Sequence, residues 1–173
     1  MRPIAAALAA LLAAGAAAAQ VPPPAREIAR VASSPPALIL QGVVVPAGAE
    51  TFYLSGQVPD PIDAAKAGKP GLTAADYGDT RTQTLSALAK IRRILAAHGY
   101  RMADVIRLTM FVAGDPKLGG EMDLAGMNEG FRSVFGADGE APQSVARSTV
   151  KVAGLVAPAY LIEVEAVAAR LPR

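Results

Sequence analysis

The chain of 173 residues contains no cysteine and only one histidine, His98. Without cysteine there can be no disulfide, thiolate zinc site, iron–sulfur cluster or thiol nucleophile. A single histidine argues against a histidine-based catalytic triad and against a metal site built from several imidazoles. We therefore expect no metal and no other cofactor.

Excess charge of either sign and aromatic residues are also scarce. The chain has 17 basic and 15 acidic residues, a net charge of +2, and only 5% aromatic residues. Nucleic-acid binding requires a broad basic surface, often with aromatic stacking platforms, so we do not expect it here. The length suits one domain and is short for two.

The first twenty residues, MRPIAAALAALLAAGAAAAQ, are rich in alanine and carry one charge. Arg2 precedes an apolar run from Ile4 to Leu12 that is too short to span a bilayer, and Ala17 to Ala19 fit a signal-peptidase site. We expect residues 1–19 to be an export signal that is removed, leaving a protein in the periplasm with no membrane insertion. A retained anchor, the alternative, would require a longer apolar segment.

The remaining chain divides into a tether and one domain. Residues 20–36 contain Pro22-Pro23-Pro24 and Pro35-Pro36, which disfavour helix and sheet, so we expect a proline-rich tether. Residues 37–173 form the predicted domain. It begins with strands at 37–47 and 51–55, joined as a hairpin, and a loop follows over 56–71.

Two helices and three further strands are expected. One helix should run from Thr73 to about His98 and end at Gly99, and the second should cover about 118–135 and end at Gly136. Their predicted buried residues are Leu85, Leu88, Ile91 and Leu95 in the first, and Leu124, Met127, Phe131 and Val134 in the second. The strands should cover 105–113, 144–152 and 160–169. The order ββαβαββ predicts an α+β domain with a mixed sheet and two helices on one face.

The last two strands alternate between apolar and polar residues. Even positions such as Val150 and Val164 are small or apolar, whereas odd positions such as Arg147 and Glu163 are polar. Alternation predicts that the odd set faces away from the helices. If the strands form a hairpin centred on Leu155, Arg147 lies opposite Glu163 as a cross-strand pair. The simplest interpretation is an exposed ion pair; the alternative is an anion-binding site covered by another subunit.

Two other polar motifs have mainly structural interpretations. Ser55-Gly56-Gln57 resembles an ordinary turn after a strand, and no plausible base follows to activate Ser55 as a nucleophile. Glu121 and Asp123 suit a helix start, where carboxylates interact with the helix dipole, and do not by themselves indicate a metal site.

Five segments resemble one known family in order and approximate spacing, over about residues 48–169. They are SGQVP at 55–59, VIRLTMFVAG at 105–114, MNEGF at 127–131, ARSTV at 146–150 and IEVEAVA at 162–168. Together they are similar to the RidA-like members of the Rid/YjgF family of reactive-intermediate deaminases. The resemblance implies a chorismate-mutase-like fold that assembles as a homotrimer, with ligand clefts between subunits.

The resemblance also implies an activity and a site. Family members hydrolyse 2-imino and enamine acids to 2-keto acids and ammonia, so the expected partners are a small 2-imino or 2-keto acid and other copies of the chain. By position, Arg147 would bind the substrate carboxylate and Glu163 would position the attacking water. The remaining residues of the implied cleft are Ser55, Gly56, Asn128 and Thr149.

Alternatives to an exported deaminase stay open at this stage. Deaminating members carry a tyrosine upstream of the SGQ strand, whereas this chain has LILQGVVVP there. That difference favours either another substrate or a trimer that binds small carboxylates in the same cleft without turnover. A structural or chaperone-like role would not require Arg147 and Glu163.

Overall fold

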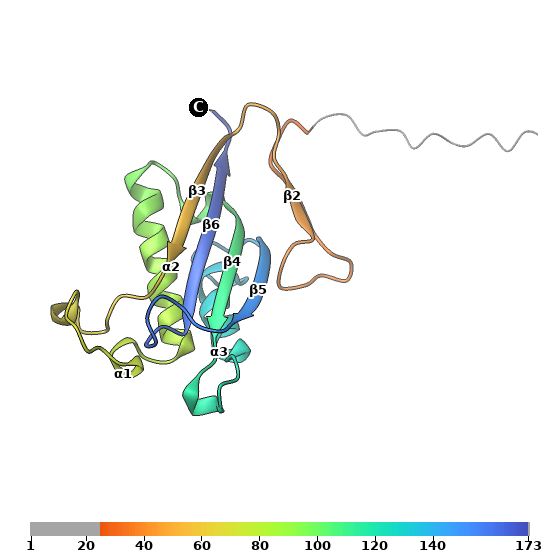
Figure 1. Cartoon of the computed structure of the whole chain (residues 1–173). Coiled ribbons are helices and arrows are strands. Elements are labelled where there is room, and N and C mark those ends of the chain that lie inside the picture. Colours follow the sequence, from red (N-terminus) through yellow and green to blue (C-terminus); the bar gives the residue numbers. More distant parts are fainter. Residues whose placement is uncertain (1–24, 173) are drawn as a thin grey trace, which may run out of the picture.

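A four-stranded mixed sheet forms the centre of the structure, and two long helices cover one of its faces (Figure 1). The computed structural model describes residues 25–172, so the predicted export signal lies outside the described residues. The strands are β1 Ala29–Val31, β2 Gly42–Val44, β3 Glu50–Gln57, β4 Val105–Ala113, β5 Ala146–Val152 and β6 Ile162–Arg170. The helices are α1 Ala74–Tyr77, α2 Thr80–Ala97 and α3 Leu124–Phe135, with 3-10 turns at Ala64–Lys66, Met102–Asp104 and Pro116–Leu118.

The strand order in the main sheet is β3-β6-β4-β5. β4 and β5 run parallel and are joined through α3, whereas β6 pairs antiparallel with both β3 and β4. The predicted α+β class, with a mixed sheet and two main helices, is therefore confirmed. A parallel pair requires a crossover connection, and α3 provides it between β4 and β5.

The core lies between the sheet and the two long helices. In β6 the even positions are buried and face the helices, as the alternation predicted. The helices contribute Leu88, Ile91 and Leu95 from α2, and Met127, Phe131 and Val134 from α3, all as predicted. Leu85 is only partly buried, and Leu124, at the start of α3, is exposed.

The predicted hairpin between the last two strands is wrong, because β6 lies between β3 and β4 and does not touch β5. The chain after β5 crosses to the middle of the sheet, where both flanks of β6 are paired. A strand with a fully apolar inner row suits this central position. β5, with a mixed row, forms the edge.

The first predicted hairpin is also wrong, because β2 pairs with β1 and not with β3. β1 belongs to the segment predicted as a tether, which is therefore partly structured. The Arg30 guanidinium fixes β1 by donating to the carbonyls of Ser144, Ala103 and Val105. Leu40 bridges to Ala146 at the free edge of β5, so this hairpin stands beside β5 and apart from the main sheet (Figure 1).

The first predicted helix begins at its predicted cap, Thr73, but glycine divides it into α1 and α2, and the second predicted helix begins later than expected. Gly78, with φ of +85°, separates α1 from α2, and the Asp79 carboxylate then caps α2 by accepting from the Thr82 N–H at 2.8 Å. Gly119 and Gly120 have positive φ as well, and α3 starts only at its cap, Asp123. Helix ends at Gly99 and Gly136 are confirmed. Within residues 25–172, no helix has the length and apolar character that crossing a bilayer would require.

Candidate functional site

Arg147 lies on the helix-covered side of the sheet, at the edge strand β5. It pairs in register with Leu108 of β4, a buried core residue whose side chain faces the helices. Paired residues on neighbouring strands project to the same face, so Arg147 faces α3. The prediction that the odd positions of β5 point away from the helices is therefore wrong.

Three side chains of α3, from Met127, Asn128 and Phe131, hold the Arg147 side chain. Its Nη2 donates to Asn128 Oδ1 at 2.8 Å, and its Cζ lies 4.4 Å from the centroid of the Phe131 ring. The Met127 sulfur is 3.8 Å from Nη1. The cap at Asp123 fixes where α3 begins, and residues 127, 128 and 131 then fall on adjacent positions of one helix face. The guanidinium is thus oriented before any ligand arrives.

Arg147 keeps unused hydrogen-bonding capacity despite its partial burial. Its Nε is buried without a hydrogen-bond partner, and so is Oγ1 of Thr149, two residues along on the same side of β5. None of the ion pairs in residues 25–172 involves Arg147. Burial, and to a lesser extent the nearby Arg132 charge, lower the pKa of Arg147 from its usual value. An oriented, unpaired guanidinium is suited to bind a carboxylate with two parallel hydrogen bonds.

Glu163 lies elsewhere, against the last residues of β3, which extends to Gln57 and so includes the Ser55-Gly56-Gln57 segment predicted as a turn. A Cβ built on Gly56 would come within 1.8 Å of the Glu163 Oε1 atom, so only glycine allows the carboxylate to take this place. The pairing between β3 and β6 is irregular here, between Leu54 and Gln57, which brings the Gly56 backbone against the carboxylate. Ser55 is exposed beside it.

The six predicted site residues therefore form two groups within one chain. Arg147, Asn128 and Thr149 lie on the helix side of the sheet, and Ser55, Gly56 and Glu163 lie together at β3 and β6. Glu163 pairs with Phe111, an odd position of β4, which places it on the open face. The predicted cross-strand contact between Arg147 and Glu163 is wrong, because the two side chains leave opposite faces of one sheet.

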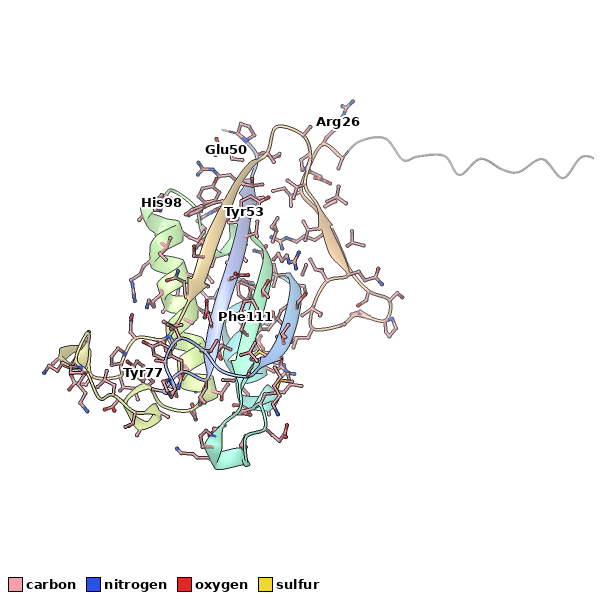
Figure 2. The ribbon with its side chains drawn as sticks, viewed as in Figure 1. Arg26, Glu50, Tyr53, Tyr77, His98 and Phe111 are labelled. Atoms are coloured by element: carbon pink, nitrogen blue, oxygen red, sulfur yellow. The ribbon has the colours of Figure 1, made fainter. Side chains whose placement is uncertain are left out.

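The open face carries a cavity of about 370 Å³ next to the Glu163 group. Its polar lining residues are Tyr53, Ser55, Arg107, Thr109 and Glu165. Tyr53 is 74% exposed. Figure 2 labels Tyr53 on β3 and Phe111 on β4, two strands of the main sheet. No helix of the described chain covers these side chains, and the surface contains both charges and apolar area.

Sequence reasoning assigned Met127 and Phe131 to the core and missed their contact with Arg147. The signal was present in MNEGF, where Phe131 lies four residues after Met127 and three after Asn128, so all three share one helix face. Among residues 25–172, no group of three or more histidine or carboxylate side chains is arranged to hold a metal ion.

A family model described as "Endoribonuclease L-PSP" matches residues 41–170, three quarters of the chain. The protein belongs to this family, which is also called Rid/YjgF and includes enamine and imine deaminases. The family assigned from the five sequence segments is thus confirmed.

Individual relatives agree with this assignment. RutC family protein PH0854 of Pyrococcus horikoshii is 33% identical over 117 residues, covering 68% of this chain and 77% of the relative. The structure of the Rid family protein YyfB from Yersinia pestis is 27% identical with a TM-score of 0.55, covering 75% of this chain and 85% of YyfB. TdcF of E. coli, solved with bound serine, is 27% identical with a TM-score of 0.53, covering 82% and 93% of the two chains.

Proposed function

We propose that this protein hydrolyses 2-imino and enamine acids to 2-keto acids and ammonia, in clefts between the subunits of a homotrimer. The observation that carries the proposal is the state of Arg147. Its guanidinium is oriented by Asn128 and Phe131 and has no ion-pair partner in the described chain. A partly buried charge without a counter-ion is costly, and a substrate carboxylate would supply the missing partner.

The proposed chemistry follows from the two groups of residues. Arg147 holds the carboxylate of the imino acid, and the Thr149 hydroxyl offers a further hydrogen bond beside it. Glu163 accepts a proton from water as the water oxygen bonds to the imine carbon. The first proton passes from Glu163 to the nitrogen, which gives an adduct with a hydroxyl and an amino group on one carbon. The hydroxyl then loses its proton as the carbonyl forms, the nitrogen takes up this second proton, and the carbon–nitrogen bond breaks to release ammonia and the 2-keto acid. An enamine first becomes the imine by protonation at carbon.

Assembly is a necessary part of this proposal. Arg147 and Glu163 leave opposite faces of the sheet, so one chain cannot present both to one ligand. In a closed threefold ring every cleft is equivalent and is formed by two neighbouring subunits. We assign Arg147 of one subunit and Glu163 of the next to each cleft. The polar cavity and the exposed Tyr53 on the open face support coverage by another copy.

A trimer that binds small carboxylates without turnover is the alternative. TdcF, the E. coli relative described above, was solved with bound serine, a small acid that carries an amine and not an imine. Arg147 would serve binding alone equally well. In that case Glu163 would contact the ligand but transfer no proton.

A single comparison separates the two functions. The protein is mixed with 2-aminoacrylate generated in the cuvette, and pyruvate release is timed against the uncatalysed rate. Deamination predicts acceleration by the wild type that Glu163→Gln removes, while pyruvate binding measured by calorimetry persists in both proteins. An amide is a poor base for water, which explains the selective loss. Binding by the wild type without any acceleration would favour the alternative.

We also propose that the protein is exported to the periplasm after removal of residues 1–19. The support is the sequence alone: a basic start, a short apolar run and three alanines before Gln20. Intact-mass measurement of protein from the cell envelope fraction should give a chain that begins at Gln20. A chain that retains Met1, or a protein confined to the cytosol, would contradict export.

A further inference from the structure

Arg132 occupies the helix turn directly after Asn128, on the same face of α3. Residues four apart on a helix lie one above the other, with a rise of about 6 Å between them. Asn128 is hydrogen-bonded to the Arg147 guanidinium at 2.8 Å, so the Arg132 side chain starts one turn from the proposed carboxylate position. Arg132 also follows Phe131, whose ring contacts Arg147.

The Arg132 charge is exposed and has no carboxylate partner in residues 25–172. Glu129 is the only carboxylate within α3, and it pairs with Arg81 at 3.5 Å. Farther along β5, Lys151 pairs with Glu121 at 2.8 Å. Glu129 and Lys151 are thus paired, whereas Arg147 and Arg132 have no carboxylate partner within residues 25–172. The effect of Arg132 on the pKa of Arg147 agrees with their proximity.

Two free guanidinium groups beside one cleft favour a ligand with two negative charges. A ligand with one carboxylate neutralises Arg147 and leaves Arg132 facing a net-neutral complex. A second carboxylate at the far end of the ligand would be attracted by Arg132 and would relieve the repulsion between the two arginines. Because Arg132 is exposed, its effect should be moderate and sensitive to salt.

We propose that the preferred substrates are 2-imino dicarboxylic acids, with Arg147 binding the carboxylate next to the imine and Arg132 attracting the distal carboxylate. This inference rests on the proposed function, since it uses the same cleft. The hydrolysis is unchanged: water adds at the imine carbon, ammonia leaves, and a 2-keto dicarboxylic acid is released. Arg132 acts in selecting the substrate and takes no part in proton transfer.

The test compares two keto acids of equal carbon number, 2-oxoglutarate and 2-oxopentanoate, which differ in the distal carboxylate. Calorimetry on the intact protein at low ionic strength should give about fivefold tighter binding of 2-oxoglutarate, as expected for an exposed ion pair. In Arg132→Gln the ratio of the two dissociation constants should fall to about one. Arg93→Gln is the matched control. Arg93 lies in α2, and its exposed guanidinium pairs with Asp60.

Each outcome bears on a separate claim. A preference for 2-oxoglutarate that disappears in Arg132→Gln, survives in Arg93→Gln and weakens with added salt supports the inference. Equal binding of both acids by the wild type, or a preference that survives in Arg132→Gln, overturns it and leaves the proposed function standing. If the wild type binds neither acid, the proposed function fails and the inference fails with it.

Discussion

Arg147 and Glu163 project from opposite faces of the same sheet. Arg147 is in register with Leu108 on the helix-covered side, and Glu163 is in register with Phe111 on the open side. The two residues are two strands apart and three positions apart along β4, about 10 Å in each direction. If both act on one ligand, the ligand must lie where two subunits meet.

The first prediction concerns the guanidinium of Arg147. Arg147→Ala should weaken 2-keto acid binding by about 3 kcal/mol, or roughly a hundredfold, because two charge-assisted hydrogen bonds are lost. Arg147→Lys should be nearly as damaging, since an ammonium cannot reproduce the two-pronged geometry or stack on Phe131 in the same way. Calorimetric titration with pyruvate measures both. Binding by Arg147→Ala as tight as the wild type would show that the ligand lies elsewhere.

The second prediction concerns the contact between Gly56 and Glu163. Gly56→Ala should push the Glu163 carboxylate away, because the new Cβ would overlap Oε1. A displacement of this size should lower turnover by about a hundredfold. Gly154→Ala is the control, since its Cβ would meet no atom within 4 Å. The account would be contradicted if both variants kept wild-type turnover while circular dichroism showed them equally folded.

The third prediction concerns the pH dependence of stability near α1. A hydrogen bond from Lys66, followed by bonds from the Thr73 N–H and hydroxyl, lowers the pKa of Asp76 to about 2. A carboxyl whose pKa is lowered by folding stabilises the fold above its unfolded pKa, near 4, and loses that contribution as pH falls toward 2. Asp76→Asn should therefore lower Tm at pH 7, and the difference from wild type should shrink between about pH 4 and pH 2. A constant difference over pH 2–7 would argue against an ionic cause.

Sequence patterns predicted the positions of the four main-sheet strands and one face of that sheet, but not β1 or the strand neighbours. In β6 the buried even row was readable, because a central strand packs a continuous apolar row on the helices. In β5 both rows contain polar or small residues, so alternation could not say which side faces α3. The side is set by pairing with β4 and by the stacking of Arg147 on Phe131. Both are tertiary contacts that no local pattern encodes.

The candidate site was predicted residue by residue, and its division into two groups was not. Motif resemblance named Arg147, Asn128 and Glu163, but the assumed hairpin placed Arg147 opposite Glu163. Long-range strand order decides that relationship, and β6 reaches the middle of the sheet after a connection of nine residues, 153–161. Gly78 and Gly119 were visible in the sequence, and their positive φ explains the break between α1 and α2 and the later start of α3.

Subunit mixing tests the shared cleft most directly. Arg147→Ala and Glu163→Gln chains carrying different tags are co-expressed, mixed trimers are purified through both tags, and turnover of 2-aminoacrylate is measured. With Arg147 from one subunit and Glu163 from its neighbour, every mixed trimer contains one restored cleft, so about a third of the clefts should be active although each parent is inactive. Mixing Arg147→Ala with a chain carrying both substitutions is the control and should restore none. Verified mixed trimers that stay as inactive as their parents would contradict the account.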